Sequence, residues 1–83
     1  MYYVYIIESS SRWYYGFSEN LDQRIKDHNS NRSKYTRNKG PWKLIFKRTF
    51  VDKKTAIKFE SQLKKVRNKK YIKEKYKDFF IEV

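Results

Sequence analysis

The chain contains no cysteine, so disulfide bonds and thiolate metal sites are excluded, and nothing in it requires an oxidising compartment. It also has no long hydrophobic run, because no apolar stretch approaches the roughly 20 residues that span a bilayer. The apolar start, residues 1 to 7, is too short for a secretory signal peptide. We therefore expect a cytoplasmic, soluble protein without a membrane partner.

Acidic residues are scarce as well. Lys and Arg total 21 against 9 Asp and Glu, which gives a net charge of +12. Residues 1 to 31 hold three basic and four acidic residues (3 − 4 = −1), and residues 32 to 83 hold eighteen and five (18 − 5 = +13). This asymmetry predicts a polyanionic partner, most simply nucleic acid, bound through residues 32 to 77. The alternative is a solubilising lysine-rich surface.

Aromatic residues, in contrast, are abundant: eight Tyr, six Phe and two Trp. In a chain of 83 residues these side chains must supply much of one small core, so we expect a single domain over residues 1–83. Tyrosine and tryptophan also need partners for their polar ends. A tyrosine-rich core therefore tends to bring hydroxyl groups toward the surface.

The local patterns predict an α/β (α+β) fold with the element order β-β-α-β-α-α. Ser9-Ser10-Ser11 separates two runs rich in β-branched and aromatic residues, so these form a hairpin. Gly16 within the second run indicates a bulge or a close backbone approach. Asp52 is a good helix N-cap. The predicted strands are 2–8, 12–17 and 42–50, the predicted helices are 21–30, 53–67 and 69–77, and residues 31–41 form a loop.

Arg24 and His28 are four residues apart on the first predicted helix, so they share the face that also carries Leu21 and Ile25. A guanidinium suits phosphate oxygens, and histidine exchanges protons near neutral pH. The alternative interpretation is structural: an arginine whose stem covers apolar surface and a half-buried histidine with a satisfied ring.

Glu60 lies four residues after Ala56 and three before Leu63, at the border of the apolar stripe of the second predicted helix. A carboxylate there must be paired or must hold a cation, because an unpaired buried charge is costly. Mg²⁺ favours oxygen sites with one or two carboxylates. The spacing equally allows an ion pair with Lys64 on the next turn.

Tyr5 and Tyr14 lie on the two strands of the hairpin. If Ser9-Ser10 is the turn, the two side chains face each other on one side of the sheet. Tyrosine is normally a poor base, but beside a cation it can relay a proton. For most of the eight tyrosines a role in the aromatic core is the simpler interpretation.

These residues occur in the order and spacing of the GIY-YIG endonuclease family. Val4-Tyr5-Ile6 and Tyr14-Tyr15-Gly16 resemble its two half-motifs, with Val4 in place of a glycine and Tyr15 in place of an isoleucine. Arg24 followed by His28 resembles its second signature, and Glu60 resembles its metal-binding glutamate. The resemblance covers about residues 2 to 72. Further matching segments are Gly16-Phe17-Ser18, Asn20-Leu21, Asp27-His28-Asn29, Lys34-Tyr35-Thr36 and Leu63-Lys64.

The resemblance implies a three-stranded antiparallel sheet flanked by helices. It also implies one catalytic site, which would contain Tyr5, Tyr14, Arg24, His28 and Glu60. Glu60 would hold Mg²⁺ or Mn²⁺. Asn68 is a further candidate for the catalytic site. The implied activity is metal-dependent hydrolysis of phosphodiester bonds, in DNA rather than RNA, either non-specific or selective for structure.

Two alternatives remain open. A basic nucleic-acid-binding module could keep this fold and cleave little, and composition alone favours it. Glu60 argues against it, since a surface that only binds phosphates gains nothing from a carboxylate. In the other alternative, the chain forms a homodimer through the aromatic tail Phe79-Phe80-Ile81.

Overall fold

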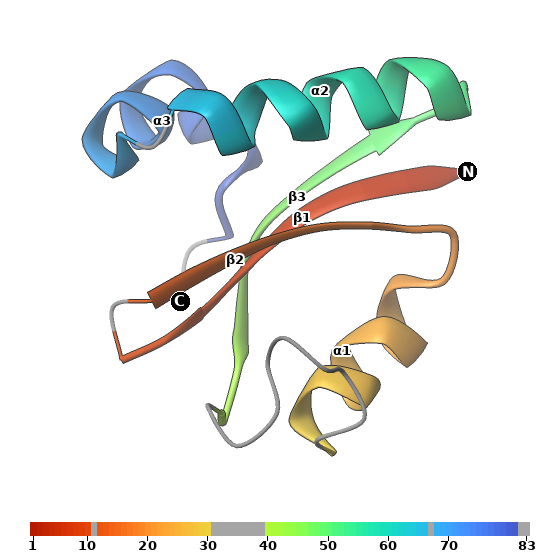
Figure 1. Cartoon of the computed structure of the whole chain (residues 1–83), viewed down its shortest axis with the longest axis vertical. Helices are drawn as coiled ribbons and strands as arrows, with labels where there is room; N and C mark the ends of the chain where they lie inside the picture. The colour runs from red at the N-terminus through yellow and green to blue at the C-terminus, as the bar shows by residue number, and fades with distance from the viewer. Residues whose placement is uncertain (11, 31–39, 67, 82–83) are drawn as a thin grey trace.

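The computed structural model describes residues 1–10, 12–30, 40–66 and 68–81. The predicted element order is confirmed (Figure 1). Most of the predicted loop, including Lys34-Tyr35-Thr36, lies outside the described residues. The elements are β1 (Tyr2–Ser9), β2 (Arg12–Ser18), α1 (Leu21–Asn29), β3 (Lys43–Phe50), α2 (Lys53–Val66), α3 (Lys69–Lys75) and a 3₁₀ helix, η1 (Lys77–Phe79).

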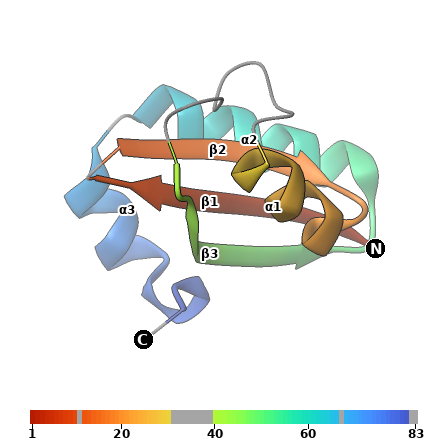
Figure 2. The same cartoon turned by 90° about the horizontal axis from the view of Figure 1, so that it is seen from below.

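The three strands form one antiparallel sheet, as predicted, and their order in the sheet is β2-β1-β3. Helices α2 and α3 cover one face of this sheet, and α1 lies against the other (Figures 1 and 2). Strand β1 is central and is therefore covered on both sides, which explains why its residues 2 to 7 are all aromatic or aliphatic. Its residues Val4 to Ile7 are completely buried.

Alternation along β1 divides the core into two clusters. Val4 and Ile6 point toward α2 and α3, whereas Tyr5 and Ile7 point toward α1. The larger cluster also contains Phe46, Ala56, Phe59, Leu63 and Ile72. The smaller one is completed by Leu21 and Trp42.

Helix capping follows the sequence closely. The Asp52 carboxylate accepts hydrogen bonds from the backbone N–H and the hydroxyl of Thr55, both at 2.8 Å. Asn20 caps α1 by accepting from the Gln23 backbone N–H at 3.2 Å. The polar residues that precede these helices thus satisfy amide groups that have no partner within the helix.

The chain after α2 departs from the prediction in two places. Helix α3 ends at Lys75 instead of continuing to residue 77, and η1 follows. The aromatic tail then returns to β3: Phe80 forms a bridge with Phe46, and the Ile81 N–H donates to the Ile45 carbonyl at 2.8 Å. The phenylalanine rings of the tail therefore pack within the chain.

Two smaller differences concern β3. It begins at Lys43, whereas the sequence suggested Trp42, which is buried just before the strand. Its pairing with β1 shifts between Ile6 and Ile7, where a β-bulge interrupts the register. Among the described residues, no helix has the length and apolar character needed to cross a membrane.

Candidate active site

Gly16 creates the space in which the Tyr5 side chain lies. A Cβ atom added to Gly16 would be only 2.2 Å from Tyr5 Cζ and 2.3 Å from its hydroxyl oxygen. The close approach predicted from this glycine is therefore confirmed, and the group that approaches is an aromatic ring. The contact also places the Tyr5 hydroxyl over β2, an edge strand, instead of over the centre of the sheet.

The two tyrosines share a face of the sheet, but they are not directly opposite as predicted. Tyr5 pairs with Gly16, and Tyr14 pairs with Ile7. The difference arises in the turn, because Ser9 pairs with Arg12 and is therefore still part of the strand. A turn placed one residue later shifts the partner of every β1 residue by two positions along β2.

His28 lies in the last turn of α1 and is completely buried. Its Nε2 is 2.8 Å from the Tyr5 hydroxyl oxygen, within hydrogen-bond distance. The imidazole also meets both tyrosine rings edge-on, with centroid distances of 5.9 Å to Tyr5 and 4.9 Å to Tyr14. The only histidine of the chain thus links the two candidate tyrosines.

Arg24 lies one turn before His28 on α1 and is half-buried. Its guanidinium interacts with the hydroxyls of both Tyr5 and Tyr14, through charge and side-chain hydrogen bonding. Burial alone would lower the pKa of Arg24, but these interactions with the two tyrosines raise it. Arg24 is therefore a permanent cation between the two hydroxyl groups.

The environment separates the proton affinities of Tyr5 and His28. Burial lowers the pKa of His28 to about 4, helped by the Arg24 charge and opposed by Asp27. Burial also raises the pKa of Tyr5 to about 12, although Arg24 opposes this shift. At neutral pH the imidazole is thus neutral and the phenol protonated, so the phenol can donate to Nε2.

Glu60 comes from α2, on the other side of the sheet, and its side chain is 16% exposed. It forms the ion pair with Lys64 that the sequence allowed, at 3.3 Å. Its charge nevertheless contributes to the raised pKa of Tyr5, after the larger effects of burial, Arg24 and Tyr14. The side chain of Tyr5 extends over β2 at Gly16. Helix α2 runs along the same edge strand on the other face of the sheet (Figure 2).

The donor set fits a hard cation held by a single carboxylate. Throughout the described ranges there is no group of three or more His, Cys, Asp or Glu residues suited to binding a metal. Mg²⁺ does not need such a cage, because one or two carboxylates, water and substrate phosphate suffice. Glu60, whose side chain is largely buried and whose charge reaches Tyr5, supplies one such carboxylate.

Two asparagines have structural roles. Asn68, the further candidate, caps α3 by accepting from the Tyr71 backbone N–H at 3.0 Å. Asn29, next to His28, accepts from the Trp42 N–H at 2.6 Å and donates to the Trp42 carbonyl at 3.1 Å. This pair of hydrogen bonds fixes the end of α1 against the start of β3. Sequence reasoning missed it, because nothing local connects residues 29 and 42.

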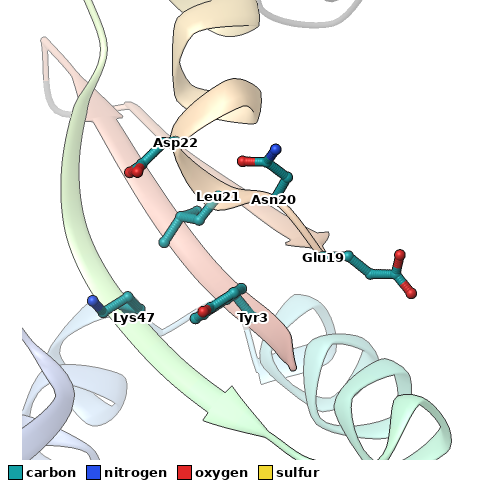
Figure 3. Close-up of a pocket in the computed structure, with 6 residues that line it drawn as sticks. All are labelled: Tyr3, Glu19, Asn20, Leu21, Asp22 and Lys47. Carbon is teal, nitrogen blue, oxygen red and sulfur yellow. The ribbon is translucent and has the colours of Figure 1, made fainter.

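A pocket of about 220 Å³ lies beside the start of α1 (Figure 3). It is separate from the candidate residues, since its lining comes from the first turn of α1 and from the strands below it. Two carboxylates, Glu19 and Asp22, and one cation, Lys47, line it, and the Glu19 side chain points away from the lysine. The remaining lining residues are Tyr3, Asn20 and Leu21.

Comparison with known proteins agrees with this geometry. The model of the GIY-YIG catalytic domain matches residues 1–77. The UPF0213 protein BH0048 of Halalkalibacterium halodurans is 38% identical over 71 residues, covering 83% of this chain and 76% of its own. The UPF0213 protein CPE1444 of Clostridium perfringens is 42% identical over 73 residues, covering 84% and 78%.

Structural comparison gives the same family. The solution NMR structure of the UPF0213 protein BH0048 from Bacillus halodurans aligns with a TM-score of 0.56 at 33% identity. The alignment covers 92% of this chain and 82% of that one. The chain therefore belongs to the GIY-YIG catalytic domain family and has a GIY-YIG nuclease fold.

Proposed function

We propose that the protein is a metal-dependent endonuclease that hydrolyses phosphodiester bonds in DNA, without sequence specificity or with selectivity for DNA structure. One observation supports this most: a buried histidine lies 2.8 Å from the Tyr5 hydroxyl, while Arg24 interacts with both tyrosines. A structural aromatic core does not need a permanent cation between two phenols. A site for a charged phosphate does.

In the proposed reaction a water oxygen attacks phosphorus, and the bond from phosphorus to the leaving oxygen breaks. Tyr5 accepts a proton from the water as its own proton passes to His28 Nε2. Tyr14, the other hydroxyl beside Arg24, is the alternative acceptor. The leaving oxygen takes its proton from solvent.

Substrate binding would prepare this relay. In the free protein burial and Arg24 keep the pKa of His28 low, so the imidazole is a weak base. A phosphate held by Arg24 brings negative charge that compensates the guanidinium and raises the proton affinity of the imidazole. The proton acceptor would then be strongest when the substrate is in place.

Glu60 is the residue that would hold the metal. A bound Mg²⁺ or Mn²⁺ would offset negative charge on the phosphate and the leaving oxygen. Arg24 would stabilise the same charge from α1. The two cations would therefore come from opposite faces of the sheet, one from each flanking helix.

Nicking of supercoiled plasmid with Mg²⁺ or Mn²⁺ tests this proposal. Glu60→Gln keeps the size of the side chain and removes its charge, so nicking should be lost while DNA binding persists. Lys64→Gln is the matched control. It breaks the same ion pair, which at 54% exposure of the lysine contributes about 0.5 kcal/mol or less, and should leave nicking intact.

The alternative, a binding module, is favoured by the net charge of +12. It predicts DNA binding without nicking in the presence of any metal. It also predicts that Glu60→Gln and Lys64→Gln behave alike in both assays. A panel of duplex, single-stranded, branched and flapped substrates, with RNA counterparts, would then define the substrate. Nicking that Glu60→Gln leaves unchanged would refute the metal site.

A further inference from the structure

Two lysines of α3 lie over a tryptophan of β2. Lys69 Nζ is 5.3 Å and Lys73 Nζ is 5.6 Å from the centroid of the Trp13 ring. The lysines are four residues apart, so they project from the same side of the helix. We call Trp13, Lys69 and Lys73 the Trp13 platform.

The tryptophan of this platform is held in place from several sides. Its Nε1 donates to the Glu8 carboxylate at 2.8 Å. Its ring also contacts those of Tyr15 and Phe80, with centroid distances of 6.2 and 5.9 Å. Because the ring is fixed and a cation favours its face, the platform holds two ammonium groups at a defined place.

Helix α3 is strongly basic, and like charges four residues apart on a helix repel each other. Helix α3 carries four lysines and one glutamate, a net charge of 4 − 1 = +3 over seven residues. Glu8, the carboxylate beside the ring, is half-buried and bonded to the indole. Lys69 and Lys73 are both exposed, so an incoming anion could reach them.

The platform lies directly behind the candidate active site. Trp13 and Tyr14 are neighbours in β2, so their side chains lie on opposite faces of the sheet. Trp13 packs with the α2 and α3 side, and Tyr14 with the α1 side. Since β2 is an edge strand, a bound polymer could pass round this edge and meet both side chains.

We propose that the Trp13 platform is a second phosphate-binding site, which holds a backbone phosphate of the nucleic acid flanking the one at Arg24. The polymer would run round the β2 edge, with its scissile phosphate on the α1 side and the flanking phosphate between Lys69 and Lys73. This inference rests on the proposed function for the identity of the polymer. It adds which side chains position it and where it passes.

The platform would contribute to binding and not to the chemical step. Each lysine that contacts a phosphate adds about one unit to the slope of log affinity against log salt. Lys69→Gln/Lys73→Gln should therefore lower that slope by about two and weaken binding by roughly tenfold or more near physiological salt. In cleavage assays KM should rise and kcat should stay close to that of the parent.

The experiment measures binding of a short labelled DNA duplex in EDTA, so that it is independent of cleavage. The matched control is Lys54→Gln/Lys58→Gln, which removes the same charge from two exposed lysines spaced four apart on α2. Melting temperatures of both double variants should equal that of the parent. Trp13 fluorescence should change on binding, and the signal should disappear in Trp13→Phe.

The outcomes separate this inference from the proposed nuclease activity. A loss specific to the Lys69/Lys73 variant supports the platform even if no metal produces nicking. Equal losses in both double variants would refute it, since charge alone would then explain binding. The inference would also be refuted if binding to phosphatidylserine vesicles, and not binding to DNA, depended on these lysines.

Discussion

The two faces of the sheet differ in what they contain. On the α2 and α3 side, none of the seven buried residues of the cluster is titratable, and partly buried aromatic rings pack against them. On the α1 side, the buried cluster has four hydrophobic members, one of which is Tyr5, and His28 is buried beside it. The buried cluster of one face thus resembles an ordinary core, and the buried residues of the other face include ionisable groups.

This contrast indicates that one face mainly stabilises the fold and the other carries the candidate site. A cluster of Val, Ile, Leu and Phe provides stability through burial and packing, without polar groups that need partners. Burying a histidine and a tyrosine instead requires mutual hydrogen bonding and shifts both pKa values. Residues that break the rules of a stable core are expected at functional sites.

The largest change in stability should come from the apolar face. Leu63 is 1% exposed, and Leu63→Ala should lower the free energy of unfolding by about 2–5 kcal/mol, because it leaves a cavity. Urea denaturation measures the loss. Cleavage per folded molecule, assayed well below the melting temperature, should be unchanged. A proportionate loss of kcat would mean that the two faces are not separable.

Gly16→Ala should lower the stability less than Leu63→Ala does, but it should reduce cleavage more. The added methyl group would be 2.2 Å from Tyr5 Cζ, so the ring must move. We expect about 1–3 kcal/mol of destabilisation, typical of overpacking, together with loss of cleavage. Gly40→Ala is the control, since a Cβ atom added to Gly40 would lie no closer than 3.2 Å to its nearest neighbour, Cδ1 of Trp42. Wild-type kcat in Gly16→Ala would show that the Tyr5 position is unimportant.

The smallest expected effect, within any one pH unit, is a pH dependence of stability. The pKa of His28 in the folded protein, about 4, lies below its ordinary value of 6.5. On acidification the unfolded chain binds the proton first, so stability present above pH 6.5 is lost as the pH falls toward 4. One proton gives a slope of at most about 1.4 kcal/mol per pH unit. Melting curves of the parent and His28→Gln should diverge in this window, and parallel curves would contradict the shift.

Much of the fold could be predicted because its signals are local. The spacing of Leu21, Arg24, Ile25 and His28 predicted which side of α1 faces inward, and Leu21 and His28 are buried. The hairpin was predicted as well, but not its register. Three consecutive serines offer equivalent turns, and the choice between them determines whether Tyr5 pairs with Tyr14 or Gly16.

Long-range features of the site were harder to predict. Helical spacing indicated that Glu60 borders the buried side of α2, but it could not show which strand edge the carboxylate approaches. The contacts from Asn29 to Trp42 and from Trp13 to Lys69 join residues distant in sequence. No periodicity marks such contacts, because they depend on how the helices dock on the sheet.

Arg24→Lys tests the central claim most directly, since lysine keeps the charge and loses the bidentate geometry of the guanidinium. Single-turnover cleavage at saturating DNA should fall by about 10²-fold to 10³-fold, as when one preorganised donor is removed from a charged transition state. DNA affinity and melting temperature should remain close to those of the parent. If Arg24→Lys cleaves as fast as the parent, the α1 face does not carry the chemistry.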